Sequence, residues 1–338
     1  MNALKVYVVI PNWNGTDRLR ASLDSLKVQT QPHEVVVVDN GSVDGSIELM
    51  EKNYPSVILI KHDHNKGFAG GVNPGLKLAI EDKARYAALL NNDAVADKDW
   101  LKHLVKFLDS NPKAGIVTSK ILEAGGKELD STGDIYTTWG LPYPRGRDEE
   151  DQGQYDEQRW VFGASGGASL YRIKTLEEIG LFDEDFFAYY EDIDISFRAQ
   201  LTGWKIGYEP KATVLHQISA TSAPIKGFAT YHTLKNLPLL FWKNVPWPLM
   251  PVIGPRLFIL YWGIAMRALS RGLFAAFFKG VLMSMVLWPK KLMQRHRIQK
   301  NRKVSVDYLK SIIVYDLPPN ANHLRNLRAK WWHLRGKA

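Results

Sequence analysis

Residues 35–46, VVVVDNGSVDGS, place four consecutive valines directly before Asp39 and a group of turn-forming residues. Unbroken β-branched runs suit strands that are buried on both faces, as in a parallel sheet. Val6–Ile10 is a similar run, and Val57–Lys61 and Tyr86–Leu90 follow along the chain. The quoted stretch therefore predicts a buried strand with a polar carboxyl end.

Helical patterns alternate with these strands. Leu19, Leu23 and Leu26 recur at the spacing of one helix face, between the first two strands. Further helices are expected at Ser46–Lys52, Val72–Asp82, Trp100–Asp109 and Ile173–Ile179, and further strands at Gly115–Ser119, Trp160–Leu170 and 212–215. This alternation predicts an α/β fold with a doubly wound, mostly parallel sheet, in which ligands bind at the carboxyl ends of the strands.

Residues 134–160 differ from this pattern. They combine turn formers, an acidic cluster and scattered aromatic residues, which predicts a long mobile loop. The glycines of the next segment, WVFGASGGASL (160–170), weaken a strand. Either another group approaches the backbone closely there, or a plain bulge interrupts the strand.

The composition limits the chemistry. The chain has 338 residues and no cysteine, which excludes disulfides, zinc–thiolate sites and cysteine nucleophiles and fits a reducing, cytoplasmic compartment. The first apolar run ends at Pro11, so we interpret it as a strand and not as a signal peptide. Residues 220–338 hold 20 Lys+Arg and 2 Asp+Glu, whereas 1–219 hold 24 and 33. This asymmetry predicts two modules, 1–220 and 221–338, with different partners.

Asp39 ends its strand, where a carboxylate can accept hydrogen bonds from a ribose or a base edge. Turn formation by Asn40 and helix capping by Asp44 explain the same stretch equally well. A dinucleotide-binding fold requires G-x-G-x-x-G after the first strand, whereas this chain has PNWNG at 11–15. A G-x-x-x-x-G-K-[ST] loop is also absent from the sequence. These motifs weigh against an oxidoreductase and a P-loop enzyme.

Two further residues follow predicted strands. Asp93 comes after Asn91-Asn92, where a carboxylate can hold Mg²⁺ or Mn²⁺ against a diphosphate, or can simply belong to a surface turn. His216 is either a second metal ligand, which would favour Mn²⁺, or a hydrogen-bonded core histidine. The glycine-rich stretch 65–75 opens a helix and either admits a diphosphate to its backbone N–H groups or forms an ordinary turn.

YYEDIDISFR (189–198) places Glu191, Asp192 and Asp194 among aromatic and branched residues. Acids in the first turn of a helix complement its dipole, and Asp194–Arg198 is an i,i+4 ion pair. Alternatively, an acid beside apolar rings has a raised pKa, which suits a general base. These ten residues alone favour the helix start.

The ordered motifs together resemble a known family. They are VVIPNWNG, VVDNGSxDGS, NxGFAGGxNxG, LLNND, GASGGA, GxFDExFFxYxEDID and VxH, across residues 5–220. This set resembles the inverting glycosyltransferases of family 2, and most of all the rhamnosyltransferase-like branch that builds bacterial surface polysaccharides. The resemblance implies a GT-A fold, a nucleotide-diphospho-sugar donor and a divalent metal, Mn²⁺ or Mg²⁺.

The resemblance also implies roles for particular residues. Asp192, next to Glu191, takes the place of the catalytic base, and Asp93 with His216 would bind the metal. The implied nucleotide and sugar contacts are Pro11, Asn12, Asn14, Asp39, Asn65, Gly67, Phe68, Asn73 and Asn92. The family's D-x-D element appears as Asn91-Asn92-Asp93, without its first acid. Q-x-x-R-W, which marks the processive synthases, is absent, so we expect transfer of a single sugar.

The implied reaction moves a sugar from a nucleotide-diphospho-sugar to a lipid-linked saccharide acceptor. The first choice of donor is dTDP-rhamnose, followed by UDP-galactofuranose, UDP-galactose and UDP-N-acetylglucosamine. The missing first acid of the D-x-D element supports an alternative, a catalytically inactive GT-A protein that binds nucleotide sugar or scaffolds an assembly.

The segment Leu257–Trp288 contains only three charges, Arg267, Arg271 and Lys279, and a basic tract, Lys290–Lys303, follows. One polar stripe on an apolar helix predicts a peripheral anchor on the anionic inner face of the cell membrane, although two shorter helices also fit. The alternative is a helical hairpin packed on the catalytic domain or on the partner of a homo-oligomer. A nucleic-acid partner is not expected, because RNA-binding surfaces interleave basic and aromatic residues on a polar background.

Overall fold

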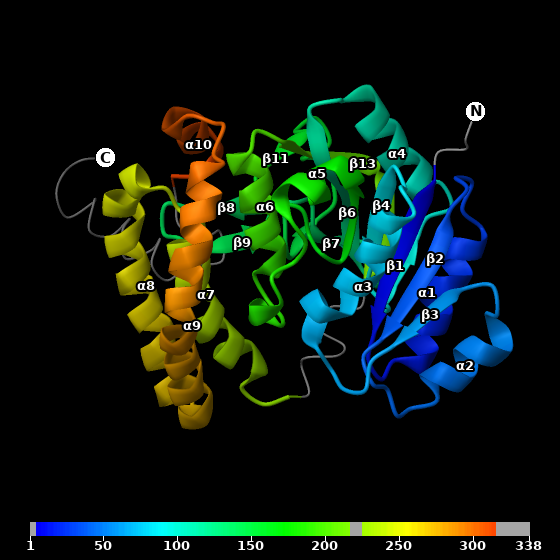
Figure 1. Ribbon diagram of the computed structural model, residues 1–338, viewed down its shortest axis with the longest axis horizontal. Coiled ribbons are helices and arrows are strands. Elements are labelled where there is room, and N and C mark those ends of the chain that lie inside the picture. Colours follow the sequence, from blue (N-terminus) through cyan, green and yellow to red (C-terminus); the bar gives the residue numbers. More distant parts are fainter. Residues whose placement is uncertain (1–4, 217–224, 316–338) are drawn as a thin grey trace.

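An eleven-stranded sheet forms the centre of the molecule, in a computed structural model that describes residues 5–216 and 225–315 (Figure 1). A separate two-stranded sheet consists of β8 Asp134–Tyr136 and β9 Pro142–Pro144. The strands of the large sheet are β1 Val6–Asn12, β2 Glu34–Asp39, β3 Ile58–Lys61, β4 Tyr86–Leu90, β5 Ala94–Ala96, β6 Ala114–Glu123, β7 Glu128–Ser131, β10 Glu149–Glu150, β11 Trp160–Val161, β12 Ala168–Arg172 and β13 Lys205–His216. The helices are α1 Thr16–Lys27, α2 Ser46–Asn53, α3 Gly67–Glu81, α4 Trp100–Ser110, α5 Ile173–Ile179, α6 Glu191–Leu201, α7 Phe228–Asn244, α8 Met250–Ser270, α9 Phe274–Lys300 and α10 Val306–Ile312, with short 3₁₀ helices η1 Glu184–Phe186 and η2 Trp247–Leu249.

The sheet has the predicted parallel centre. Strands β3, β2, β1 and β4 pair in parallel, in that order. Strand β12 is antiparallel and lies between β4 and β6, and β13 runs parallel to β6. Val8 and Val9 are neighbours on β1 and point to opposite faces of the sheet, and both are fully buried. Burial on both faces explains the unbroken apolar run of this strand. The mostly parallel α/β fold is therefore confirmed.

Helices cover both faces of this sheet. One core joins Val8 to apolar residues of α1, α2 and α4, and a second core joins Val9 to α3, α5 and α6. Because β1, β2 and β4 are parallel, their carboxyl ends meet at one edge of the sheet. The polar segments at Asn12, Asp39 and Asn91 therefore come together there.

Residues 134–160 contain the short strands β8, β9 and β10 joined by turns, so the expectation of one continuous long loop was wrong. Strands β8 and β9 make a hairpin, and β10 pairs with β7. Tyr136 is fully buried, and the buried guanidinium of Arg145 donates to the carbonyl oxygens of Thr132 at 2.8 Å and Gln158 at 3.3 Å. Contacts between residues distant in sequence hold the segment, and a local pattern does not reveal such contacts.

The single strand expected at Trp160–Leu170 is divided between β11 and β12. Gly166 lies in the intervening stretch, where a Cβ atom would come within 2.9 Å of Cζ of Phe68. Of the two explanations for these glycines, the close approach of another group is therefore the one that the structure supports.

The C-terminal helices form a layer beside the sheet, with α7, α8 and α9 next to one another at the left of Figure 1. Leu237 and Leu240 of α7 share a core with Ile193 and Phe197 of α6. Helices α7 and α9 approach so closely that a Cβ at Gly280 would lie 2.9 Å from the carbonyl oxygen of Tyr231. The sheet-containing segment and the C-terminal helices are therefore packed together.

Leu257–Trp288 is not one helix, because α8 ends at Ser270 and α9 begins at Phe274. Its three charges thus do not form a stripe on one helix, and the two-helix alternative is the correct one. The inner sides of these helices pack on α7, but their outer sides expose many large apolar side chains. They include Phe258, Ile259, Trp262, Met266, Phe274, Phe278, Leu282, Met285 and Val286. Within the described residues, one helical stretch, Trp247–Ser270, is long and apolar enough to cross a membrane.

Candidate active site

A cavity of about 580 Å³ lies at the carboxyl ends of β1 and β4. Of the residues singled out in the sequence, its lining includes Pro11, Asn12, Asn65, Gly67, Phe68, Asn92, Asp93, Glu191, Asp192 and His216. The β8–β9 hairpin and the start of α7 also contribute, through Asp134, Tyr143 and Phe228. Segments that are far apart in the chain thus converge on one cavity.

Asp93 and His216 face each other in this cavity. Antiparallel pairing of β5 with β13 sets Ala94 opposite His216, which brings Asp93 Oδ1 within 3.1 Å of His216 Nε2. The other ring nitrogen, Nδ1, donates to Oδ2 of Asp130 at 2.8 Å. Burial lowers the pKa of His216, but Asp130 and Asp93 raise it more, to about 9.

This pair fits a divalent metal. Asp93 Oδ1 is a buried carboxylate oxygen, and Nε2 of His216 faces it at 3.1 Å. A carboxylate and an imidazole suit Mn²⁺, and a carboxylate at the second ring nitrogen is the usual way to orient a metal-binding histidine. Within 5–216 and 225–315, no group of three or more His, Cys, Asp or Glu side chains is arranged to hold a metal ion. The remaining positions would therefore fall to oxygens of a bound ligand or of water.

A chain of buried hydrogen bonds connects the ends of β4, β1 and β2. Nδ2 of Asn92 donates to Oδ1 of Asn12 at 2.7 Å, and Nδ2 of Asn12 donates to Oδ2 of Asp39 at 2.9 Å. The second oxygen of Asp39 accepts from the backbone of Ser42 at 2.8 Å. Asp39 therefore lies behind Asn12 and outside the cavity lining, where it orients the side chain that reaches the cavity.

Asn14 and Asn73 also lie outside the lining. Asn14 Oδ1 accepts from the backbone N–H of Val43 at 2.9 Å and so ties two loops together. Asn73 is buried, and its Nδ2 donates to the carbonyl oxygen of Phe182 at 3.0 Å and to Glu184 at 2.9 Å. Both asparagines have structural contacts, and neither meets the cavity in this structure.

Gly67 joins the two sides of the cavity. Its φ is +71°, and a Cβ would lie 2.3 Å from the carbonyl oxygen of Phe187, so only glycine fits. The next N–H, of Phe68, donates to that same oxygen at 2.6 Å, and Asn65 Oδ1 accepts from Gly67 N at 2.8 Å. The glycine-rich turn is thereby fixed against the segment that precedes α6.

Asp192 lies in the first turn of α6. One carboxylate oxygen accepts from the backbone N–H of Ile193 at 2.8 Å and the other from Gly166 at 3.3 Å. Burial raises the pKa of Asp192 above its usual value, although these N–H groups oppose the rise. Burial and the neighbouring Asp192 raise the pKa of Glu191 to about 8. Carboxyl groups with raised pKa values are suited to proton transfer near neutral pH.

Among the lining residues that sequence reasoning missed, two are charged, Asp134 and Arg147. Oδ2 of Asp134 is buried without a hydrogen bond, and burial together with Asp192 raises the pKa of Asp134 well above its usual value. Arg147 pairs with Asp130 and brings a positive charge to the cavity. Both residues lie in the segment 134–160, which was expected to be a loop. The β-branched and aromatic pair Ile135-Tyr136 was the available signal of a strand.

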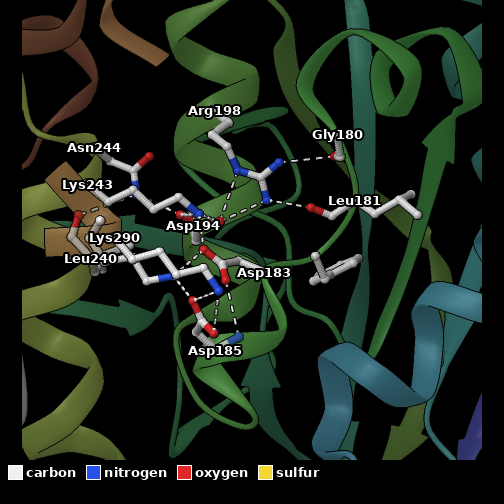
Figure 2. A network of polar contacts seen from close by, with 12 residues as sticks. Gly180, Leu181, Asp183, Asp185, Asp194, Arg198, Leu240, Lys243, Asn244 and Lys290 are labelled. Atoms are coloured by element: carbon white, nitrogen blue, oxygen red, sulfur yellow. Dashed lines mark hydrogen bonds and ion pairs between the residues drawn. The ribbon is translucent and has the colours of Figure 1, made fainter. Parts of the chain in front are cut away.

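A cluster of charges, buried except at Lys290 and partly at Asp185, fastens α6 and the segment before it to α7 and α9 (Figure 2). It consists of Asp183, Asp185, Asp194, Arg198, Lys243, Lys290 and Lys291. Asp194 is fully buried, and burial raises its pKa, but Arg198 and Lys243 lower it below the usual value. Because Asp194 follows Asp192 by one helical half-turn, the cluster holds the start of α6 in place.

The architecture is that of the GT-A glycosyltransferases, and the fold assigns the protein to this class. Mannosyltransferase PcManGT from Pyrobaculum calidifontis, solved with GDP-Man and Mn²⁺, has a similar fold over 88% of this chain and 85% of its own, with a TM-score of 0.52 and 17% identity. The family model of Glycosyl transferase family 2 matches residues 7–180, and the chain belongs to this family. The protein is therefore a glycosyltransferase.

Two curated relatives extend the comparison. The chain is 27% identical over 250 residues to the N-acetylglucosaminyl-diphospho-decaprenol L-rhamnosyltransferase of Mycobacterium tuberculosis, covering 67% of this chain and 80% of that protein. It is 26% identical over 207 residues to the poly-beta-1,6-N-acetyl-D-glucosamine synthase of Staphylococcus aureus. That match covers 59% of this chain and only 47% of the synthase.

Proposed function

We propose that the protein is a metal-dependent, inverting glycosyltransferase that moves one sugar from a nucleotide-diphospho-sugar to a lipid-linked glycan acceptor in bacterial cell-surface polysaccharide synthesis. The observation that carries this proposal is the convergence of Asp93, His216 and Asp192 on one cavity. A donor needs a diphosphate site and the acceptor needs a base, and the cavity offers residues for both.

Asp192 is the proposed general base. Its carboxylate accepts the proton of the acceptor hydroxyl while that oxygen bonds to C1 of the donor sugar and the bond from C1 to the diphosphate oxygen breaks. Attack from the face opposite the diphosphate inverts the configuration at C1. The N–H groups of Gly166 and Ile193 orient the carboxylate for this transfer.

Asp93 and His216 are the proposed metal ligands. A divalent ion bound there would stabilise the negative charge of the departing diphosphate as a Lewis acid. Arg147 lines the same cavity, and a guanidinium group binds phosphate oxygens well. Asn91 replaces the first acid of the D-x-D element. Its side-chain nitrogen Nδ2 lies 3.3 Å from Nε2 of His216, so Asn91 contacts a proposed metal ligand.

The first choice of donor is dTDP-rhamnose, supported by the similarity to an L-rhamnosyltransferase. UDP-N-acetylglucosamine, UDP-galactofuranose and UDP-galactose are the other candidates, the first of them supported by the similarity to a poly-N-acetylglucosamine synthase. Transfer of a single sugar is favoured because Arg198 and Trp204 have other contacts. Arg198 pairs with Asp194, and the indole N–H of Trp204 donates to Glu178 at 2.8 Å.

The outer faces of α8 and α9 support a place at the inner, cytoplasmic face of the cell membrane. Phe278 and Met285 are 64% and 65% exposed, and basic residues follow on the same helix. Apolar residues on such a face enter the acyl boundary while basic residues meet anionic headgroups. Vesicle flotation tests this, with Phe278→Ser/Met285→Ser expected to weaken binding to phosphatidylglycerol vesicles. The control Val43→Ser removes an apolar residue of the catalytic segment that is even more exposed, at 90%.

One observation favours a second candidate, an inactive nucleotide-sugar-binding protein: Asn91 stands where the family has an acid. A donor screen separates the two. Each nucleotide sugar is incubated with Mn²⁺ or Mg²⁺ and N-acetylglucosaminyl-diphospho-decaprenol, and released nucleoside diphosphate is measured. Turnover of one donor, dependent on metal and acceptor, supports the enzyme. Binding of nucleotide without turnover of any donor supports the inactive protein.

A further inference from the structure

The segment Phe187–Tyr190, between η1 and α6, has an unusual backbone. Phe187 has φ +64° and ψ −62°, and the N–H of Ala188 donates to the carbonyl oxygen of Phe186 at 2.7 Å. These are the angles and the hydrogen bond of a γ-turn of the rare, strained form. A phenylalanine holds this conformation only where surrounding groups impose it.

The strain continues toward the proposed base. Tyr189 and Tyr190 have φ values of +67° and +73°, in the left-handed region that side-chain-bearing residues seldom occupy. Both tyrosines line the active-site cavity, and α6 begins at the next residue, Glu191. The shape of this segment therefore sets both the aromatic wall of the cavity and the position of Asp192.

Asn236 of α7 holds the strained segment. Its side chain is fully buried, and Nδ2 lies 2.9 Å from the carbonyl oxygen of Phe186, 2.8 Å from that of Ala188 and 2.8 Å from that of Tyr189. All three partners are acceptors, so the amide NH₂ must face them. The two N–H bonds of one side chain are thus shared among three carbonyls of one turn, which an extended or helical segment would not present together.

Neighbouring residues of α7 cover the same turn. Nζ of Lys235 donates to the carbonyl oxygens of Asp185 at 2.7 Å and Phe186 at 3.1 Å. One helical turn earlier, the ring of His232 stacks on Phe187, with centroids 5.4 Å apart and planes 10° apart. Burial and Lys235 lower the pKa of His232 to about 4, so the stacked ring is neutral. This face of α7 fits the turn closely.

We propose that Asn236 is a positioning residue for glycosyl transfer: it holds Phe187–Tyr190 in the strained conformation that forms the acceptor side of the cavity and presents Asp192. The proposal rests on the proposed function for its kinetic part. Asn236 lies outside the family match at 7–180, so the C-terminal helices supply a part of the active site. On the donor side, Asn12 and Asp93 have no contact with Asn236 among those described above, whereas Phe68 meets the turn through its N–H, which donates to the carbonyl oxygen of Phe187.

The test compares Asn236→Leu, which keeps the volume but loses the N–H donors, with the wild-type full chain. Donor binding is measured by calorimetry with dTDP and UDP in the presence of Mn²⁺. Kinetics are measured with N-acetylglucosaminyl-diphospho-decaprenol as acceptor. We expect nucleotide Kd values within about twofold of wild type and a loss of kcat/KM for the acceptor of roughly 10-fold to 10²-fold, with a raised acceptor KM.

The matched control is Gln299→Ala. Its Nε2 donates to the carbonyl oxygen of Asn244 at 2.8 Å, so the change also removes a hydrogen bond between α9 and α7 but leaves the turn intact. It should keep the kinetic constants of wild type. Asn236→Ser, which retains one donor, should give an intermediate loss and serves if Asn236→Leu does not fold. A fall in kcat alone, in proportion to the folded fraction, would show a merely structural role and overturn the proposal.

Hydrogen exchange gives a readout that does not need turnover. Amides of 186–192 should exchange at least about 10-fold faster in the Asn236 variants than in wild type and in Gln299→Ala, with the strands β1 and β4 unchanged. Unchanged protection of 186–192 would overturn the proposal. If wild type transfers no sugar, the proposed function fails, but this exchange experiment still decides whether Asn236 holds the turn.

Discussion

Replacing Lys243 by methionine should lower the free energy of unfolding by about 3 kcal/mol, whereas Lys290→Met should lower it by less than about 1 kcal/mol. The Lys243 side chain is 4% exposed and lies 2.6 Å from Asp183 and 2.8 Å from Asp194. The Lys290 side chain is 53% exposed and, within the residues that the structure describes, pairs with Asp185 alone. The two changes remove the same group from the same cluster (Figure 2) at different depths.

The size of the expected loss in stability for Lys243→Met follows from the partners that Asp183 and Asp194 retain. Removing one partner of a buried ion pair typically costs about 3–5 kcal/mol, because the other charge stays buried and uncompensated. After Lys243→Met, Asp194 retains Arg198 and Asn244, and Asp183 retains Lys291, which favours the lower end. An entropy of unfolding of roughly 2.1 cal/mol/K per residue over 338 residues then converts 3 kcal/mol into a fall in Tm of about 4 °C.

The effect of Lys243→Met should depend on pH. Burial raises the pKa of Asp183 and of Asp194, but the lysines and Arg198 lower both pKa values below the usual range. A carboxyl group with a depressed folded pKa stabilises the fold above its unfolded pKa, near 3.8, and this stability is lost as pH falls through the folded pKa. The difference in Tm between wild type and variant should thus be full above about pH 5 and shrink in acid.

Thermal melts and urea unfolding of wild type, Lys243→Met and Lys290→Met, from about pH 3 to pH 8, measure these differences. Equal destabilisation by the two substitutions would refute the reasoning from burial. A pH-independent difference for Lys243→Met would show that its contribution is packing of the lysine stem and not charge.

Three further predictions concern the cavity. Asp192→Asn should slow transfer by about 10²–10⁴-fold and leave nucleotide binding nearly unchanged, and a variant with near-wild-type turnover at saturating donor would exclude it as the base. Asp93→Ala and His216→Ala should each weaken Mn²⁺-dependent nucleotide binding measured by calorimetry, with a double variant that is less than additive. Full activity of the wild-type protein in EDTA would instead show that the reaction does not require a metal ion. The pKa of Glu191 rises from 4.5 in the unfolded chain to about 8 in the fold. Between these two pH values the folded protein keeps the proton of Glu191 and the unfolded chain loses it, so the free energy of unfolding falls as pH rises from 4.5 to about 8. In urea unfolding, the free energy of unfolding of Glu191→Gln should depend less on pH than that of wild type between about pH 5 and pH 8. The same pH dependence in both proteins would contradict the raised pKa of Glu191.

The strands at the sheet centre were predictable because burial on both faces requires unbroken apolar runs. Val6–Ile10 and Tyr86–Leu90 show this, and both lie in the observed strands β1 and β4. Parallel order then places the polar strand ends at one edge, so the convergence of Asn12 and Asn92 on the cavity followed from topology. Asp39 was expected to face the ligand, but pairing with Asn12 holds it behind the lining.

Sequence alone determined the α/β class, the polar strand ends and the resemblance to a glycosyltransferase family, since these depend on local periodicity and on the order of motifs. Only the tertiary structure showed that Asp134 faces the cavity, that β8 and β9 form a hairpin, and that Asn236 binds the turn before α6. The hydrogen bonds of Asn236 join residues 47–50 positions apart. Such contacts depend on how α7 packs against α6, and the periodicity of either segment carries no information about that packing.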